Sequence, residues 1–269
     1  MCGIAGWFGA RAGFDPAAAM GALRHRGPDG QGVWRDAAGQ AGFVHTRLAI
    51  LDLTDAGAQP MGLRNEGSAW VTCTSAFADA RYWLIFNGEI YNFAELKAEL
   101  EGTGEAFHGH SDTEVLLRLL ALEGAAAPPR LAGMFAFAFY DREQGCGMLA
   151  RDAFGIKPLF YVQQEDGIAF ASEVRALRAS TQPPRCQPDA LRDTLMWGTV
   201  QEPESSVDGV RQLPAGSYLR WDAAGARIER WHELRFSGAP PAAPVAATRA
   251  ALLESVERHL VSDVPVGIF

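Results

Sequence analysis

The chain has 269 residues, of which 48% are hydrophobic and 21% charged, and its formal net charge is -8 with a pI of about 5.3. This composition is typical of a soluble globular protein of one or two domains, and the negative charge argues against nucleic acid or an anionic membrane as the main partner. No apolar run approaches the roughly 20 residues that span a bilayer, and the N-terminus has no signal-peptide pattern. We therefore expect a cytoplasmic protein.

The four cysteines, at positions 2, 73, 146 and 186, have neither the density of a disulfide framework nor the spacing of a metal site. Cys2 differs from the others because removal of Met1 would leave a thiol and a free α-amino group on one residue. An α-amino group has a pKa of about 7.7–8.0 and a thiol about 8.5, so the amine can take the thiol proton near neutral pH. Any chain can carry Cys at position 2, but this start also predicts an acyl-transfer nucleophile.

In the first third of the chain, an Asp-Pro cap predicts a helix over Ala17–Leu23. Arg24–Gly30 taken alone indicates a charged, solvated turn. Gly42–Leu53 has the pattern of a strand interrupted at His45–Arg47, and residues 64–81 have no periodicity, which indicates a loop.

A short apolar strand is predicted over Tyr82–Phe86, and two helices follow. Asn92 is expected to cap the first, Phe93–Leu100, with Glu at its third position completing a capping box. Ser111 is expected to cap the second, Asp112–Glu123, in the same way, with a glycine closing its C-terminal end.

The next segment predicts an antiparallel sheet that is covered on both sides. Gly133–Tyr140 is apolar on both faces, and short strands follow at hairpin spacing over Gly147–Arg151, Leu159–Val162 and Ile168–Ala171. Together with the amphipathic helices, this pattern predicts an α+β fold in which two antiparallel sheets pack face to face with helices outside.

The C-terminal part predicts another helix and further strands over Asp189–Trp231. Ala239–Pro244 has the composition of a linker, and Val245–Leu260 the pattern of an amphipathic helix that begins a further unit. If that unit is incomplete, the apolar face of this helix is exposed or paired with another copy, and the tail is mobile or prone to association.

Six blocks resemble, in order, the glutaminase domain of glutamine-hydrolysing asparagine synthetase, a class II glutamine amidotransferase. They are Met1–Ile4, Arg24–Asp29, His45–Ile50, Asn87–Asn92, Ser111–Val115 and Ala150–Pro158. The likeness covers nearly all of residues 1–235. The second and fourth blocks favour asparagine synthetase over the amidotransferases that make glucosamine 6-phosphate or phosphoribosylamine.

The resemblance implies an N-terminal-nucleophile fold, a four-layer αββα sandwich, and a glutamine site. In that site Cys2 attacks the side-chain amide of glutamine, and the Asn87 amide and the Gly88 N–H stabilise the tetrahedral oxygen. Arg47 would bind the α-carboxylate of glutamine, and Glu89 and Asp112 the α-ammonium. The resemblance also implies substrate contacts from Leu48, Ala49, Ile50 and Leu51.

Plainer interpretations exist for several of these residues. Asn-Gly is a common hairpin turn, and an acid such as Asp112 is favoured in the first turn of any helix. A glycine at 88 is expected because its peptide must approach the reacting carbon without a Cβ. We expect His45 to be a packed or hydrogen-bonded strand residue and not a base, because the amine of Cys2 fills that role. We expect His108 and His110 not to bind metal, because no carboxylate or cysteine cluster accompanies them.

The end of the chain resembles the approach to the synthetase half of that family. Leu213–Gly216 looks like the join, and Ser262–Phe269 like the segment before the ATP-binding loop, which this sequence does not contain. We therefore expect residues 1–235 to form the glutaminase domain and residues 236–269 a linker and the first helix of a truncated α/β synthetase domain. The chain is then a fragment of a larger enzyme or a stand-alone glutaminase.

The expected partner of the glutaminase domain is L-glutamine, with no cofactor. Aspartate, ATP and Mg²⁺ belong to the synthetase half, and the resemblance leaves a homodimer open. Three alternatives remain: a self-activating hydrolase of another amide, a non-catalytic glutamine-binding domain, and an amidotransferase with a different acceptor. The paired charges of Arg47 and Asp112 argue against the first, and the intact Cys2 against the second.

Overall fold

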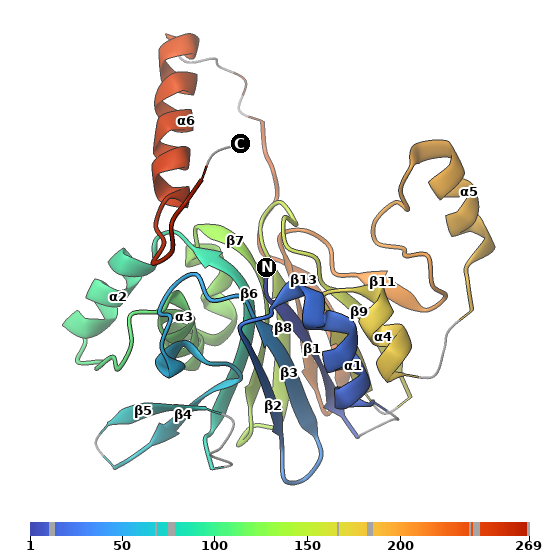
Figure 1. Cartoon of the computed structure of the whole chain (residues 1–269), viewed down its shortest axis with the longest axis horizontal. Coiled ribbons are helices and arrows are strands. Elements are labelled where there is room, and N and C mark those ends of the chain that lie inside the picture. The colour runs from blue at the N-terminus through green and yellow to red at the C-terminus, as the bar shows by residue number, and fades with distance from the viewer. Residues whose placement is uncertain are drawn as a thin grey trace.

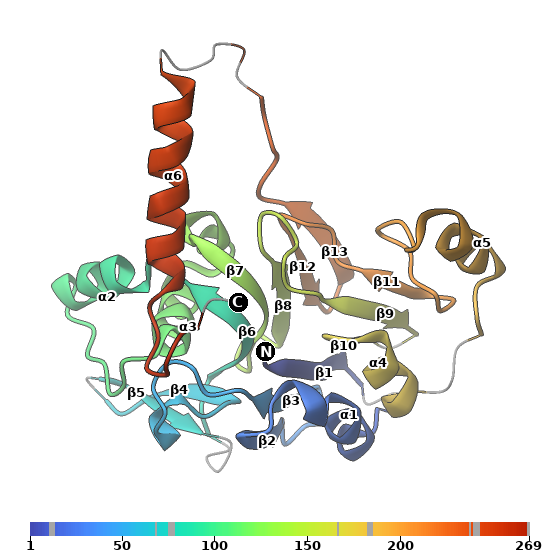
Figure 2. The ribbon, with the colours of Figure 1, turned by 45° about the horizontal axis from the view of Figure 1, so that its top comes forward.

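The protein is described here from a computed structural model, which covers residues 1–10, 14–67, 69–74, 79–165, 167–181, 185–236, 238 and 243–267. Two antiparallel sheets stack face to face, and helices cover both outer faces (Figures 1 and 2). The predicted four-layer αββα sandwich is confirmed. No helix in these ranges is long and apolar enough to cross a bilayer.

The six-stranded sheet has the order β11-β9-β10-β1-β3-β2. Its strands are β1 (Gly3–Gly9), β2 (Gly30–Arg35), β3 (Ala41–Arg47), β9 (Phe160–Gln164), β10 (Gly167–Ala171) and β11 (Val210–Gln212). The seven-stranded sheet has the order β13-β12-β8-β7-β6-β4-β5. Its strands are β4 (Met61–Asn65), β5 (Trp70–Thr74), β6 (Tyr82–Ile90), β7 (Gly133–Asp141), β8 (Cys146–Arg151), β12 (Ser217–Asp222) and β13 (Gly225–Arg230).

The helices form two outer layers and two projections. Helices α1 (Pro16–Leu23) and α4 (Val174–Ser180) cover the six-stranded sheet, and α2 (Phe93–Gly102) and α3 (Asp112–Glu123) cover the other. Helices α5 (Pro188–Trp197) and α6 (Pro244–His259) project from the sandwich (Figure 1), and the C-terminal end of α6 contacts it, where His259 lies against Tyr91. The described residues also form short 3-10 turns: η1 (Arg24–Arg26), η2 (Asp55–Gly57), η3 (Gly124–Ala126) and η4 (Pro128–Arg130).

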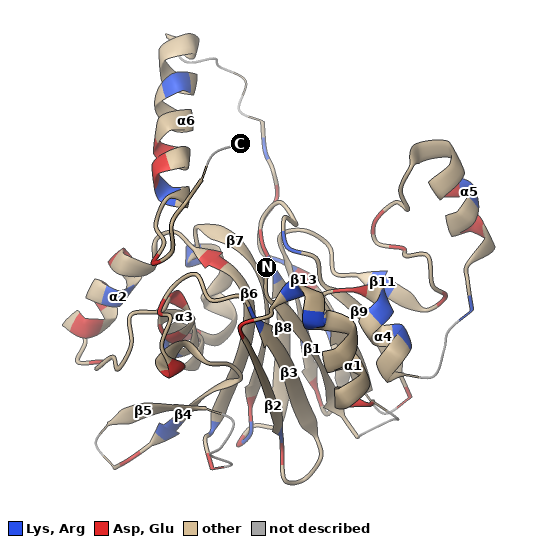
Figure 3. Ribbon diagram, in the orientation of Figure 1, with Lys and Arg blue, Asp and Glu red and all other residues tan. Residues whose placement is uncertain are grey.

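Strand β7 shows why the sheets are buried on both sides. Phe135, Phe137 and Phe139 pack toward the helices α2 and α3, whereas the alternate residues, Ala136 and Ala138, face the other sheet. Small side chains on that inner face let the sheets approach, and the aromatic side chains on the outer face fill the space under the helices. Most charged residues lie on helices and loops, and the strands are largely uncharged (Figure 3).

Three strand predictions are wrong, and two of these errors concern residues of the predicted site. His45–Arg47 does not interrupt a strand but ends β3, and the segment that follows is a loop. The strand predicted over Tyr82–Phe86 extends to Ile90 as β6, so the Asn-Gly pair at 87–88 lies inside a strand, and its alternative interpretation as a hairpin turn does not hold. Within 64–81, β4 and β5 pair as a hairpin; residues 68 and 75–78 of that segment lie outside the described residues.

The predicted helix caps have mixed outcomes. Asp15 caps α1 by accepting hydrogen bonds from two backbone N–H groups, and Ser111 caps α3 by accepting one from Glu114 N. Asn92 does not cap α2, because its side chain bonds Arg130 O and Ala132 N instead. The Glu114 side chain does not bond back to Ser111; it accepts hydrogen bonds from the backbone of residues 108–109 and pairs with Arg118.

Leu213–Gly216 lies inside the sandwich rather than at a join between domains, because β12 and β13 follow it and complete the seven-stranded sheet. The predicted linker over Ala239–Pro244 falls largely on residues outside the described ranges. The predicted amphipathic helix exists as α6, and it has no buried residue.

Candidate active site

Strand register places the predicted nucleophile beside the predicted carboxylate ligand. Gly3 pairs with Thr46 between the antiparallel strands β1 and β3, so the next pair outward is Cys2 and Arg47. Side chains alternate along a strand, so Cys2 shares the face of Ile4, and Arg47 the face of Phe43. Ile4 and Phe43 belong to the core between the sheets. Cys2 and Arg47 therefore point toward the same edge of the inter-sheet layer.

Strand β6 of the other sheet supplies the Asn87 and Glu89 side chains, and the alternation of side chains along the strand decides which way they point. Trp83 and Ile85 of β6 face the inter-sheet core, so Asn87 and Glu89 continue that face beyond it. The Asn87 side chain is 1% exposed, and its amide nitrogen, a double donor, has no hydrogen-bond partner in the part of the chain that the structure describes. A buried donor without a partner is costly, so its retention at a cavity wall indicates a ligand that completes it.

Cys2 is held at the start of β1 by backbone contacts. Its carbonyl oxygen accepts a hydrogen bond from Arg26 Nε at 2.9 Å, and the Arg26 guanidinium pairs with Glu173 at 2.8 Å. Arg26 is buried, whereas Arg24, His25, Pro28 and Asp29 are exposed, so the charged turn is solvated except at Arg26 and Gly27. The Cys2 Sγ lies 3.4 Å from Leu48 N, which donates to it. Burial raises the pKa of the thiol, and the Leu48 hydrogen bond partly opposes this.

Arg47 reaches across the loop that follows β3. Its Nη1 donates to Thr54 O at 2.9 Å, and its Nη2 donates to Asp52 O. A Cβ at Gly57 would lie 2.3 Å from Nη2, so only glycine leaves room for the guanidinium there. The planar fork has five N–H donors and keeps further ones for a ligand, as bidentate binding of a carboxylate requires.

The acidic side of the site comes from β6 and the first turn of α3. Asp112 Oδ2 accepts a hydrogen bond from Ile90 N at 3.0 Å, which ties the helix to the end of the strand. Burial raises the pKa of Asp112 to about 7, with Glu89 adding a like charge. Burial also raises the pKa of Glu89, partly opposed by Lys157. Two carboxylates that are costly to ionise indicate a site that receives a cation.

These side chains surround one cavity of about 210 Å³. Its walls include Cys2, Arg47, Leu48, Ile50, Leu51, Asn87, Gly88, Glu89 and Asp112. The volume is below the roughly 300–1,000 Å³ typical of pockets for drug-sized ligands, so it suits a small metabolite. Among the predicted contacts, Ala49 is not a wall residue; its N–H donates to Asp29 Oδ2, which holds the loop in place.

The structure gives Gly88 a reason to be glycine in addition to the one expected. A Cβ there would lie 2.2 Å from Met134 O and 2.7 Å from Phe135 Cα, both on the neighbouring strand β7. Strand pairing alone therefore requires a glycine here. Gly88 also lies on the cavity wall, so the expectation that a Cβ must be absent for the approach of the reacting carbon stays a prediction.

Sequence reasoning missed Lys157, which lines the cavity and is 6% exposed. Burial lowers the pKa of its ammonium, and Glu89 and Cys2 raise it by their charge. The residue stands in the Ala150–Pro158 block, so the resemblance contained the signal. Gln59 was also missed: its side chain accepts from Phe86 N at 2.6 Å and donates to Thr113, which joins β6 to α3 beside the cavity.

The three histidines singled out in the sequence are explained by burial or by contacts with nearby carboxylates. His45 is fully buried, as expected for a packed strand residue, and burial lowers the pKa of its imidazole to about 3, so it is neutral. His110 lies between Asp52 and Asp263, and His108 lies near Glu114. Among the described residues no group of three His, Cys, Asp or Glu side chains is arranged to hold a metal ion.

Comparison with known proteins assigns the family. The model of the glutamine amidotransferase domain matches residues 1–232. The chain belongs to this family. The amidotransferase is 35% identical over 248 residues to asparagine synthetase [glutamine-hydrolyzing] 1 of Bacillus subtilis, covering 91% of this chain and 37% of that protein. It is 36% identical over 250 residues to asparagine synthetase B [glutamine-hydrolyzing] of Escherichia coli, with coverage of 91% and 37%.

Solved structures agree with this assignment at the level of the fold. The amidotransferase matches glutamine phosphoribosylpyrophosphate amidotransferase of B. subtilis with a TM-score of 0.61 and 21% identity, over 87% of this chain and 50% of that chain. The fold is accordingly the N-terminal-nucleophile sandwich expected from the sequence. Since the amidotransferase spans only 37% of the length of the two synthetases above, their complete activities remain proposals for it.

Proposed function

We propose that this domain hydrolyses L-glutamine to glutamate and ammonia through a thioester on Cys2, once Met1 has been removed. The observation that carries this proposal is one small cavity that combines a thiol at the second residue, a partnerless Asn87 amide, the Arg47 guanidinium and the Asp112 carboxylate. Free glutamine has a matching set of groups: a side-chain amide at one end and an α-carboxylate and α-ammonium at the other.

The first chemical step needs a base for the thiol. After Met1 is removed, the α-amino group of Cys2 takes the Sγ proton, and the thiolate attacks the Cδ carbon of glutamine. In the chain with Met1 the terminal amine is one residue away, and burial lowers its pKa. Burial that raises the pKa of the thiol makes an adjacent base necessary, because little thiolate forms spontaneously at neutral pH.

The tetrahedral oxygen that forms next needs donors already in position. Asn87 supplies its partnerless amide nitrogen, and Gly88 its backbone N–H at the same wall. The protonated amine of Cys2 then gives its proton to the leaving nitrogen, the C–N bond breaks, and ammonia departs. Water attacks the thioester, the amine takes the proton of that water, and the C–S bond breaks to release glutamate and the thiol.

The α-carboxylate and the α-ammonium of glutamine are bound by residues on two different walls of the cavity. Arg47 pairs with the α-carboxylate, and Asp112 and Glu89 receive the α-ammonium. Binding the cation favours the ionised form of both carboxylates and offsets the burial that raises their pKa values. A hydrolase of another amide would have no use for this pairing of charges, which disfavours an acylase. The partnerless Asn87 amide disfavours a domain that only binds glutamine.

For the complete protein we propose the role of the synthetases that it resembles. The ammonia would then amidate aspartate to asparagine with ATP and Mg²⁺ at a separate site, in the cytoplasm, with residues 236–269 leading into that second domain. The glutaminase step itself would need no cofactor. The alternative for the chemistry is an ammonia acceptor other than aspartate. The alternative for the oligomeric state is a homodimer.

A glutaminase assay with a matched variant tests the proposal. Wild type is expected to release glutamate and ammonia in equal amounts without ATP, and Cys2→Ser to lose at least about a hundredfold in kcat. Intact-mass measurement should show a chain that begins at Cys2. An active protein that retains Met1 would contradict the shared-residue mechanism, and a folded wild type without glutaminase activity would contradict the function.

Asparagine formation is a separate measurement. The chain is incubated with glutamine, aspartate and Mg-ATP, and asparagine and pyrophosphate are quantified. For residues 1–269 we expect glutamate and ammonia alone, because the sequence contains no glycine-rich ATP loop. Asparagine made by this chain alone would mean that an ATP site exists among these residues.

A further inference from the structure

The carbonyl that orients Arg47 belongs to a residue in a disfavoured backbone conformation. Asp52 has φ 51°, and among the described residues it is the one non-glycine with positive φ. A residue with a Cβ adopts this region at a cost and stays there only when its surroundings hold it. Its carbonyl oxygen accepts the hydrogen bond from Arg47 Nη2. The direction of the guanidinium therefore depends on what holds Asp52.

Asp52 is held partly by its own carboxylate, which is buried. Its side chain accepts hydrogen bonds from Thr54 Oγ1, at 2.5 Å, and from His110 N, at 3.1 Å. Burial alone would raise the pKa of this carboxyl, but the bonds from Thr54 and His110 outweigh it and lower the pKa. The hydrogen bonds to the ionised Asp52 carboxylate fix the side chain of this residue. They do not involve its backbone N–H, which needs an acceptor from another residue.

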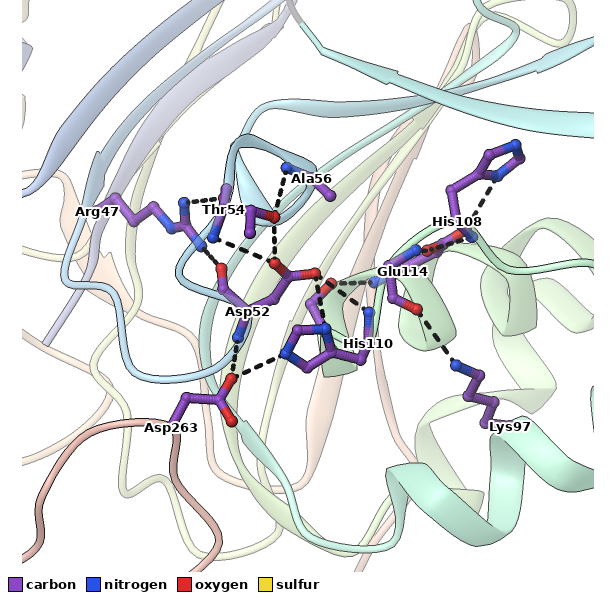
Figure 4. A network of polar contacts seen from close by, with 11 residues as sticks. Arg47, Asp52, Thr54, Ala56, Lys97, His108, His110, Glu114 and Asp263 are labelled. Atoms are coloured by element: carbon purple, nitrogen blue, oxygen red, sulfur yellow. Dashed lines mark hydrogen bonds and ion pairs between the residues drawn. The ribbon is translucent and has the colours of Figure 1, made fainter.

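That N–H is held by Asp263, from the segment that follows α6. Asp263 Oδ2 accepts from Asp52 N at 2.7 Å and lies 3.0 Å from His110 Nε2 (Figure 4). The backbone N–H of Asp263 donates to Ile50 O at 3.0 Å, in the same loop of the cavity wall. Asp263 thus contacts two residues of the glutamine-binding loop, Ile50 and Asp52, although Asp263 lies more than 200 positions further along the chain.

We propose that Asp263 is a positioning residue for glutamine recognition. Its carboxylate accepts a hydrogen bond from the Asp52 N–H and so fixes the backbone of Asp52. The Asp52 carbonyl in turn accepts a hydrogen bond from Arg47 and orients its guanidinium. The contact couples the C-terminal segment to glutamine affinity. When the segment leaves, Asp52 loses the acceptor for its N–H, and one of the two carbonyl groups that orient Arg47 is no longer held, while Thr54 O still accepts from Nη1. This inference rests on the proposed function and adds to it a control exerted from outside the cavity.

The coupling has a reciprocal consequence. If docking of the segment strengthens glutamine binding, glutamine must by linkage strengthen docking of the segment. Glutamine should therefore slow amide hydrogen exchange of residues 261–266 even though none of them lines the cavity. The Cys2→Ala protein allows this measurement, because it binds glutamine without turning it over.

The variants are Asp263→Ala, Asp263→Asn and the control Glu254→Ala. Glu254 is an acid on α6 whose ion pair, with Arg258, stays within that helix. In otherwise unaltered protein, Asp263→Ala is expected to raise KM for glutamine about fivefold or more, with kcat within about twofold of wild type. Asp263→Asn keeps an oxygen acceptor for Asp52 N and should restore much of the affinity, and Glu254→Ala should change neither constant.

Two further measurements separate this proposal from general damage. Alkylation of Cys2 by iodoacetamide needs no α-carboxylate ligand, so its rate should be unchanged in Asp263→Ala. In a double-mutant cycle, Asp263→Ala should have little additional effect once Arg47 is replaced by Ala, because it acts through Arg47. Equal losses in both Arg47 backgrounds would overturn the inference.

The outcomes distinguish the inference from the function on which it rests. In the Cys2→Ala background, the glutamine Kd of the unaltered segment is compared with that of Asp263→Ala. If wild type hydrolyses glutamine and the two Kd values agree, the positioning role is wrong and the glutaminase assignment stands. If neither hydrolysis nor glutamine binding occurs in wild type, the proposed function itself fails.

Discussion

Asp112 is the residue at which binding and stability have opposite requirements. Its carboxyl is buried at the start of α3, and burial raises its pKa from an ordinary value near 3.8 to about 7. The folded state therefore binds a proton more tightly than the unfolded state. The stability associated with that proton is complete below pH 4 and is lost progressively as the pH rises toward 7.

Asp112→Asn should consequently stabilise the fold while it weakens substrate binding. Asparagine resembles the protonated acid and keeps an acceptor for Ile90 N, so we expect a gain of about 2–4 kcal/mol above pH 7 that disappears toward pH 4. KM for glutamine should rise about tenfold or more, since the α-ammonium loses a partner. Urea unfolding across pH 4–8 measures the first effect. Asp189→Asn on the surface of α5 is the control, and a pH-independent difference would contradict the assigned titration.

In the proposed mechanism Asn87 affects the rate rather than the binding. Its amide would meet the oxygen of glutamine only when charge develops there, so Asn87→Ala should lower kcat about 10²–10³-fold with a much smaller change in KM. Steady-state kinetics alongside circular dichroism would check this. A variant that raises only KM would show that Asn87 binds the ground state and is not an oxyanion donor.

At the scale of elements, the end of β6 serves both the sheet and the site. Asn87 and Glu89 face the cavity, while Gly88 between them is pressed against β7. A single strand can do both because successive residues point to opposite faces. The absence of a side chain at Gly88 therefore lets β6 and β7 pair closely, and this strand pair carries the site.

Gly88→Ala should destabilise the protein by about 1–3 kcal/mol, because its Cβ would sit 2.2 Å from Met134 O and force β6 and β7 apart. Thermal unfolding measures this effect. Gly21→Ala in α1 is a matched control, since a Cβ there has no atom within 4 Å, and it should be neutral or stabilising by up to about 1 kcal/mol. Equal Tm values for both variants would contradict the close approach.

At the scale of the whole molecule, α6 contributes almost nothing to the core. Leu252 is 62% exposed and Val256 52%, and the apolar face that they share lies open along the helix. Most of the helix projects from the sandwich, and the segment after it returns to contact the loop that lines the cavity (Figure 4). The exposed face agrees with the expectation from the sequence pattern.

Replacing both Leu252 and Val256 by Glu should leave the stability of the chain within about 0.5 kcal/mol of wild type, because no buried surface is lost. Leu117→Ala, on the buried side of α3, should in contrast cost about 2–5 kcal/mol. Sedimentation at increasing concentration should show less association for the Glu variant than for wild type. A large fall in stability at a concentration where both proteins are monomeric would mean that this face is covered within the chain.

The sequence by itself determined the layered architecture and predicted the residues that line the candidate site. The alternating apolar residues of β7 predict a sheet buried on both sides, and the motif blocks identify Cys2, Arg47, Asn87, Glu89 and Asp112. Both signals are local, since alternation and short motifs lie within a few neighbouring residues. The same local reasoning failed where a residue has a distant partner: Asn92 bonds the segment around Arg130 and does not cap α2, and Asn87–Gly88 continues a strand because β7 pairs with it.

Only the tertiary structure decided the relations between distant segments. Lys157 is a wall of the cavity because the loop after β8 folds over it, and Asp263 is a neighbour of Asp52 because the chain returns after α6. No periodicity encodes these contacts, as they depend on how strands from two sheets and a returning tail are placed in space. The physical reason is the same in each case: burial and hydrogen bonding are settled by whatever lies nearest in three dimensions, and sequence pattern reports reliably only on neighbours along the chain.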